Sequence, residues 1–147
     1  MCEYNYNYEG NFKKGLKQGK GVFFYKNGLI KYEGEFLNGI YEGKGILNYD
    51  DGSLEYEGYF SKNKFEGEGK YIYQNDDYYK GYFKNGYKNG KGILYNKGGS
   101  KKYEGNFVDN NFDGEGNSII VMENIILGNL FKEYKMVKEN FIIKTII

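Results

Sequence analysis

Aromatic and glycine residues alternate with polar residues along most of the chain. In the stretch YEGNF at residues 8–12, a period of two places Tyr8, Gly10 and Phe12 on one face of an extended strand and Glu9 and Asn11 on the other. The same alternation returns in QGKGVFFY at residues 18–25. The pattern predicts β-strands with one aromatic face. Glycine normally weakens a strand, because it has no side chain to pack, so its recurrence needs a structural reason.

These two stretches recur along the chain as a repeat of 23 or 24 residues. The stretch YEGNF returns as YEGEF, YEGYF, YKGYF and YEGNF, starting at Tyr32, Tyr56, Tyr79 and Tyr103. A degenerate copy, ILGNL, begins at Ile126. Eleven residues after each full start lies the first glycine of a Gly-x-Gly motif, at Gly19, Gly43, Gly67, Gly90 and Gly114. Two linked motifs at a fixed offset indicate one structural unit repeated five times.

Two turns separate the predicted strands of each repeat. The position seven residues after the first tyrosine holds only glycine or asparagine: Gly15, Gly39, Asn63, Gly86 and Asn110. These residues accept a positive φ most readily, which indicates a tight hairpin turn. A second turn is marked by Asn27-Gly28, Asp51-Gly52, Asp76-Asp77 and Gly98-Gly99. The predicted fold class is therefore all-β, and we predict that the glycines are recesses over which aromatic rings lie flat.

The combination of motifs resembles the MORN (membrane occupation and recognition nexus) repeat family. The unit of that family is similar to Tyr-Glu-Gly-x-Trp, an Asn-Gly turn, a Gly-x-Gly and an aromatic residue. The family's Trp is phenylalanine here, and its polar position before Gly-x-Gly, often His, is Gln18, Glu42, Glu66, Asn89 and Asp113. The resemblance covers about residues 8–130. It implies an elongated, twisted array of antiparallel β-hairpins, one for each repeat.

The ends of such an array expose strand edges, which need a cap. We predict an N-terminal strand or tail at residues 1–7, five repeats plus a degenerate half repeat at residues 8–130, and a C-terminal cap at residues 131–147. Leu130, Phe131, Tyr134 and Val137 have helical spacing, whereas FIIKTII at residues 141–147 is typical of a strand. This segment is either a short helix and strand that cap the same chain, or a contact for a homodimer or another partner.

The composition argues against catalysis. The 147 residues include 18 Tyr, 11 Phe and 23 Gly, but no His, which is the commonest acid–base group and metal ligand. The one cysteine, Cys2, therefore has no His to activate it. The acidic pairs Asp50-Asp51 and Asp76-Asp77 are typical of solvated turns. We expect a protein that is not an enzyme and that needs no cofactor or metal. The polar N-terminus and the lack of a long apolar run predict a cytoplasmic protein.

The net charge of +1 hides strong bands of charge along the chain. Residues 8–31 hold six Lys and one Glu, a net +5, and residues 79–102 hold seven Lys and no acid, a net +7. The other three repeats are acidic: residues 32–55 carry −5, residues 56–78 carry −2 and residues 103–125 carry −5. The small total gives no overall attraction to nucleic acid. The fourth repeat could attract an anionic membrane through Lys80, Lys84, Lys88, Lys91, Lys97, Lys101 and Lys102, provided that these lysines share a face.

The predicted function is a non-enzymatic scaffold that binds a protein partner, and the resemblance implies a cytoskeletal, ciliary or membrane-associated assembly. An extended or helical peptide would lie in an aromatic groove, with the charged bands fixing its register. The predicted groove residues are Tyr8, Phe12, Tyr32, Phe36, Tyr56, Phe60, Tyr79, Phe83, Tyr103 and Phe107. One alternative is a peripheral module that binds anionic lipid, such as a phosphoinositide, through the basic repeats. Another is a regulatory fragment that serves an enzyme encoded elsewhere.

Overall fold

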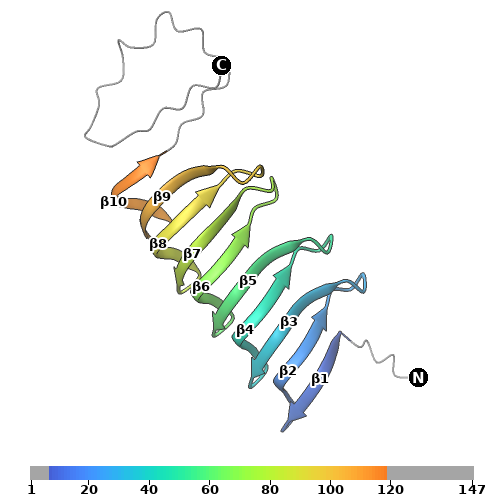
Figure 1. Cartoon of the computed structure of the whole chain (residues 1–147). Helices are drawn as coiled ribbons and strands as arrows, with labels where there is room; N and C mark the ends of the chain where they lie inside the picture. The colour runs from blue at the N-terminus through green and yellow to red at the C-terminus, as the bar shows by residue number, and fades with distance from the viewer. Residues whose placement is uncertain (1–6, 119–147) are drawn as a thin grey trace, which may run out of the picture.

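The computed structural model describes residues 7–118, which form a single antiparallel sheet of ten strands in chain order. The strands are β1 (Tyr8–Lys13), β2 (Leu16–Phe24), β3 (Ile30–Leu37), β4 (Ile40–Asn48), β5 (Leu54–Ser61), β6 (Lys64–Ile72), β7 (Tyr78–Lys84), β8 (Tyr87–Tyr95), β9 (Lys101–Val108) and β10 (Asn111–Ser118). Figure 1 shows one twisted layer with β1 and β10 at its opposite ends. The all-β array of hairpins predicted from the sequence is confirmed. The degenerate half repeat and the C-terminal cap fall on residues 119–147, outside the described part.

The tight turn of each hairpin contains two consecutive residues with positive φ. In the first hairpin these are Lys14, with φ of 51°, and Gly15, with φ of 77°. The same pair occurs at Asn38-Gly39, Lys62-Asn63, Asn85-Gly86 and Asp109-Asn110. Two positive φ values are the mark of a type I′ turn, whose twist matches that of the flanking strands. The glycine and asparagine positions predicted for this turn are confirmed.

Nine glycines form a continuous row across the sheet. Gly10 pairs with Gly21 and Gly21 with Gly34, and the row continues through Gly45, Gly58, Gly69, Gly81, Gly92 and Gly105. A Cβ atom on Gly45 would lie 2.5 Å from Cε2 of Tyr32, because the tyrosine ring rests on the bare backbone. The tyrosines of the first four repeats all lie over the row in this way. The prediction that glycines are recesses for rings is confirmed along this part of the row.

The first glycine of each Gly-x-Gly has a different role, so that prediction is wrong at this position. Gly19 has a φ of 72°, and no atom lies within 4 Å of a Cβ built on it. Its counterparts Gly43, Gly67, Gly90 and Gly114 also have positive φ. The strand register shifts between Gly10 and Asn11, so β2 holds more residues here than β1. These glycines therefore provide the left-handed conformation of a β-bulge.

The core is a chain of aromatic rings on one face of the sheet. The first tyrosine and the following phenylalanine of the repeats provide nine buried side chains, none more than 9% exposed. The Phe36 ring meets the Tyr32 ring of its own repeat edge to face at 5.1 Å, and the Tyr8 ring of the preceding repeat at 5.0 Å. The Tyr32 hydroxyl donates to the Glu35 carbonyl at 3.0 Å. Each interface between repeats is thus aromatic, and the tyrosine hydroxyls still have hydrogen-bond partners.

In the first three repeats, the polar side chain before Gly-x-Gly also links neighbouring repeats. The Glu42 carboxylate accepts a hydrogen bond from the Lys62 backbone N–H at 3.0 Å, and Glu66 accepts one from the Asn85 N–H at 2.9 Å. Gln18 makes the same contact with the N–H of Asn38 at 3.3 Å. In each case the donor is the first residue of the next tight turn. This position is therefore a clamp that fixes the spacing of successive hairpins.

The buried tyrosines make stability depend on pH in the alkaline range. Desolvation raises the pKa of Tyr79 from 10.0 to about 12, and it raises the pKa of Tyr32 and Tyr56 still further. In the unfolded chain these hydroxyls ionise near pH 10, before they ionise in the folded protein. Their contribution to stability is therefore fully present below pH 10 and is lost as the pH rises towards 12 and above.

We expect the midpoint of urea unfolding to be nearly constant from neutral pH to about 9 and to fall steeply from about 10 upwards. Parallel measurement of tyrosinate absorbance should show that most core tyrosines ionise together with unfolding. Complete ionisation of the tyrosines in a protein that stays folded would contradict the burial of their hydroxyls.

Candidate interaction surfaces

Strand alternation gives the sheet two unlike faces. The aromatic face carries the core rings and a set of half-buried apolar side chains packed against them: Phe23, Tyr41, Leu47, Phe65, Tyr71, Tyr73 and Leu94. The charged face carries the intervening residues, such as Glu33 and Lys44. Residues 7–118 form one sheet and no helix, so this part of the chain provides no second layer over either face (Figure 1).

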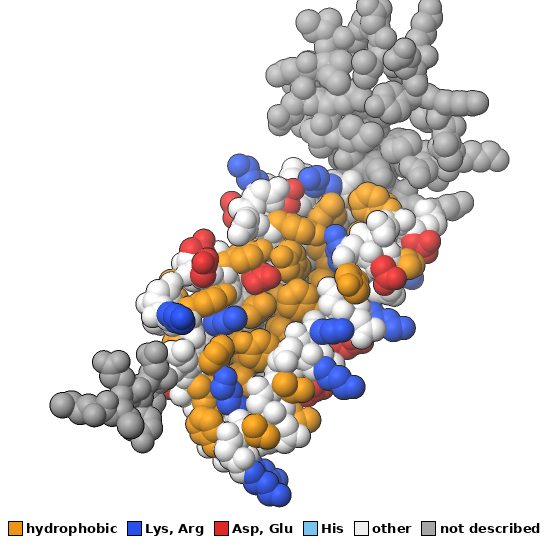
Figure 2. Space-filling view, turned by 180° about the vertical axis from the view of Figure 1, so that it is seen from behind, with side chains coloured by type: hydrophobic (Ala, Val, Ile, Leu, Met, Phe, Trp, Pro, Cys, Tyr) orange, Lys and Arg blue, Asp and Glu red, His pale blue; other side chains and the backbone are white. Residues whose placement is uncertain are grey.

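The ten aromatic residues predicted to line a binding groove are placed in the core or at its edge. Nine of them are buried against one another, and Phe12 on β1 is 61% exposed. They therefore offer little surface of their own in the middle of the array. A partner on the aromatic face would mainly contact the half-buried side chains around them. Figure 2 shows hydrophobic side chains gathered in a band along this face, bordered by lysine and acidic side chains.

One repeat position determines how apolar this band is. It lies nine residues after the first tyrosine and opposite the core phenylalanine, as in the pair Tyr41 and Phe36. The Tyr41 ring stacks on Tyr32 with centroids 3.8 Å apart, and Phe65 stacks on Tyr56 at 3.9 Å. The repeat motifs did not single out this position, although its pairing opposite the phenylalanine follows from the hairpin register.

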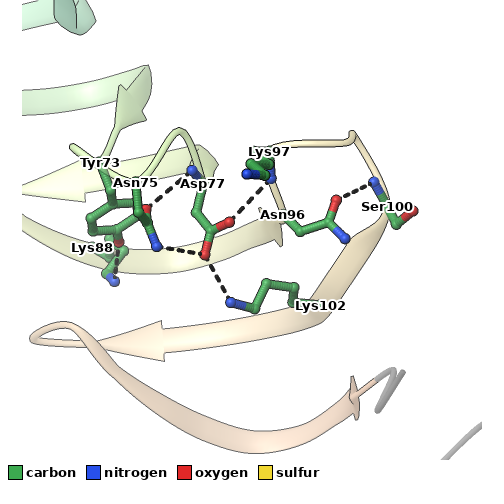
Figure 3. A network of polar contacts seen from close by, with 8 residues as sticks. All are labelled: Tyr73, Asn75, Asp77, Lys88, Asn96, Lys97, Ser100 and Lys102. Atoms are coloured by element: carbon green, nitrogen blue, oxygen red, sulfur yellow. Dashed lines mark hydrogen bonds and ion pairs between the residues drawn. The ribbon is translucent and has the colours of Figure 1, made fainter. Parts of the chain in front are cut away.

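Lysines occupy the same position in the two basic repeats. The Lys17 amino group lies 3.6 Å from the centre of the Phe23 ring, and desolvation together with nearby Lys31 lowers the pKa of Lys17. The Lys88 amino group donates to the Tyr73 hydroxyl at 2.8 Å, as Figure 3 shows. Both amino groups lie over aromatic rings, where cation–π attraction stabilises them. The aromatic face thus has one such positive charge on β2 and another on β8.

A shallow groove of about 1050 Å³ crosses the charged face from β2 to β7. Its floor includes backbone of the glycine row. Its walls carry four lysines and four glutamates, together with Val22, Ile46 and two exposed tyrosines, Tyr59 and Tyr82. The charged side chains are Lys20, Lys44, Lys70, Lys80, Glu33, Glu35, Glu57 and Glu68. Because the two signs balance, this groove has no single electrostatic preference.

The seven lysines of the fourth repeat do not form one patch. Lys88 lies on the aromatic face, whereas Lys80 lines the groove of the charged face. Lys101 and Lys102 form ion pairs with Glu104 at 2.6 Å and with Asp77 at 2.8 Å. Acids of the neighbouring repeats therefore offset part of the charge. The condition for a concentrated basic surface, a shared face, is not met.

Asp77 organises the polar network at the turns that precede β7 and β9. Its carboxylate accepts hydrogen bonds from the Lys97 backbone N–H, the Asn75 amide and the Lys102 amino group (Figure 3). The Lys102 hydrogen bond is the largest cause of the lowered pKa of Asp77. The network therefore holds the two turns together.

Within the described residues, no three Cys, Asp or Glu side chains come together in a way that could hold a metal ion. No helix in that part of the chain is long and apolar enough to cross a membrane.

The hairpins coincide with matches to a known family model. The model described as MORN repeat matches residues 8–30, 32–54, 56–78, 79–101 and 103–117. The first match contains β1 and β2, and each later match contains the next hairpin or most of it. A comparison with curated proteins found no match.

Proposed function

The chain belongs to the MORN repeat family, and we propose that it is a scaffold that binds a protein partner along its aromatic face. MORN repeats are generally interaction or membrane-binding modules, and the repeat is a non-enzymatic module. The family supports an interaction function in general terms. The choice of a protein partner rests on the chemistry of the aromatic face.

The observation that carries this proposal is an apolar band on a sheet of one layer. A sheet normally buries its hydrophobic face against a second layer, and the described residues contain none. Contiguous apolar surface with a polar border is typical of a site for another protein. Half-buried rings such as Tyr41, Phe65 and Tyr71 can bury further area when a partner covers them.

The partner chemistry follows from the same face. An extended or helical segment with apolar side chains would fill the band, and acidic groups on that segment would meet Lys17 near one end and Lys88 near the other. The family resemblance supports a cytoskeletal, ciliary or membrane-associated assembly as the setting. The alternative of anionic lipid binding has less support, because the lysines of the fourth repeat are divided between the faces.

A pair of double variants tests which face binds the partner. Tyr41→Lys with Phe65→Lys places lysine where the first and fourth repeats already carry it, so the fold should be retained. Tyr59→Lys with Tyr82→Lys adds the same charge to the opposite face. In affinity capture from native cells, followed by titration of the captured partner, we expect the first variant to bind about tenfold more weakly or worse and the second to bind normally.

Circular dichroism of both variants checks that each is folded. Equal retention of the partner by both variants would contradict docking on the aromatic face. Co-sedimentation with phosphoinositide vesicles at low salt tests the lipid alternative separately. Vesicle binding that survives in the Tyr41→Lys, Phe65→Lys variant, without any protein partner, would favour that alternative.

A further inference from the structure

We propose that the two ends of the array pair head to tail, so that β10 of one copy of the chain adds to β1 of a second copy. β1 and β10 each have only one neighbouring strand in the described sheet. Among residues 7–118, no other strand pairs with their outer edges, whose backbone N–H and C=O groups can accept another strand. The inference does not depend on the partner that binds the aromatic face.

The register for this pairing is already present in the sequence. β1 contains the same five residues, YEGNF, as β9, which pairs with β8 inside the array. In that internal pair Gly90 lies opposite Phe107 and Gly92 lies opposite Gly105. The same spacing would set Gly114 of one copy opposite Phe12 of the next, and Gly116 opposite Gly10. The row of glycines would then continue across the junction.

Exposed rings mark both ends of the array. Phe36, Phe60, Phe83 and Phe107 are at most 5% exposed, whereas their counterpart Phe12 is 61% exposed. At the other end Phe112 is also 61% exposed. Inside the array the Phe83 ring packs 5.2 Å from Tyr56 and 5.7 Å from Phe65 of the preceding repeat. Phe12 of the second copy would meet Tyr103 and Phe112 in the same way.

The clamp position and the charges of the two ends are complementary. Asp113 occupies the position from which Glu42 and Glu66 accept a backbone N–H of the next tight turn. Across the junction that turn would be Lys14-Gly15 of the second copy. Residues 8–31 carry six Lys and one Glu, a net +5, and residues 103–118 carry four acids and no Lys, a net −4. Such complementarity favours the joining of unlike ends over the joining of like ends.

Pairing of unlike ends leaves one free edge of each kind, so the expected product is an open linear series rather than a closed dimer. The first test is sedimentation velocity of the full chain over a range of protein and salt concentrations. We expect association that grows with concentration and weakens with salt. Phe12→Lys should weaken it about tenfold or more, because the ring can no longer be buried at the junction.

A charge exchange tests whether Asp113 and Lys14 face each other across the junction. Asp113→Lys alone and Lys14→Glu alone should each reduce association, since each places like charges at the junction. The double variant Asp113→Lys, Lys14→Glu should associate more strongly than either single variant. If the double variant loses as much association as the two single variants lose together, the assigned contact is overturned.

Orientation is tested by disulfide formation between copies in a Cys2→Ser background. Asn11→Cys and Glu115→Cys lie opposite each other in the proposed register, so a mixture of these two variants should cross-link on mild oxidation. A mixture of Asn11→Cys with Tyr59→Cys, on the same face but in the middle of the array, should not. A chain that is monomeric at all concentrations overturns the proposal. Association without the specific cross-link also overturns it and would fit a dimer made through another segment.

Discussion

Replacement of Gly45 by alanine is expected to destabilise the array by about 3 kcal/mol, as overpacking does in a dense core. The added Cβ would overlap the Tyr32 hydroxyl and lie 2.5 Å from Cε2 of the same ring. Tyr32 is fully buried, and edge-to-face contacts with Phe36 and Phe60 hold its ring in place. The ring therefore has no space into which it can move, and the strain must be taken by the backbone or by the aromatic chain.

Gly98→Ala is the matched control for this substitution. Gly98 lies in the turn before β9, its φ is not positive, and the nearest atom to an added Cβ is Asn96 Oδ1 at 3.4 Å. Urea unfolding of the two variants and the parent should show a large loss for Gly45→Ala and a change within about 0.5 kcal/mol for Gly98→Ala. Equal midpoints for Gly45→Ala and the parent would show that the tyrosine does not need a bare backbone beneath it.

The hairpins could be predicted because each depends on local chemistry that repeats. A tight turn with two positive φ values restricts the residues at its second position, so only glycine and asparagine stand at Gly15 and its counterparts. Five such constraints at a fixed offset specify the number and order of the strands. The role of Gly19 could not be predicted in this way, because a recess and a bulge both favour glycine.

The surfaces were harder to predict because burial in one layer is a property of neighbouring repeats. Strand alternation places Tyr32 and Phe36 on one face, but the edge-to-face chain that buries them requires the spacing between hairpins. The charge of a repeat counted along the chain likewise differs from the charge of a surface. Lys88 and Lys80 belong to one repeat and lie on opposite faces, and Lys102 pairs with Asp77 of the repeat before it.

Aromatic packing between repeats also explains how a single layer can be stable. Each tyrosine joins the phenylalanine of its own repeat to the phenylalanine of the next, so the removal of one ring breaks contacts on both sides. In a repeat array the stability is close to a sum of repeat terms and nearest-neighbour terms. A ring in the middle of the array should therefore contribute more than the same ring at its end.

Tyr56→Ala is accordingly expected to cost about 4 kcal/mol and to separate the array into two weakly coupled halves. Tyr56 is fully buried, stacks on Phe65 at 3.9 Å, and meets Phe60 and Phe83 edge to face. Tyr56→Phe keeps these ring contacts and removes only the hydrogen bond to the Tyr59 carbonyl, which is 3.0 Å long. Its expected cost is about 1 kcal/mol.

A variant at the end of the array tests whether the loss of stability comes from ring contacts between repeats. Tyr8→Ala removes the equivalent ring on the edge strand β1, where the neighbouring Phe12 is largely exposed, so its cost should be clearly lower than that of Tyr56→Ala. Urea unfolding gives the three free energies, and amide hydrogen exchange locates the loss. For Tyr56→Ala we expect protection to fall in β5 and β6 first, with the hairpins on either side exchanging at different rates. The contrary result would be an equal loss of unfolding free energy for Tyr8→Ala and Tyr56→Ala, with a uniform loss of protection against hydrogen exchange. The sheet would then fold as one unit, and the tyrosines would not couple neighbouring repeats.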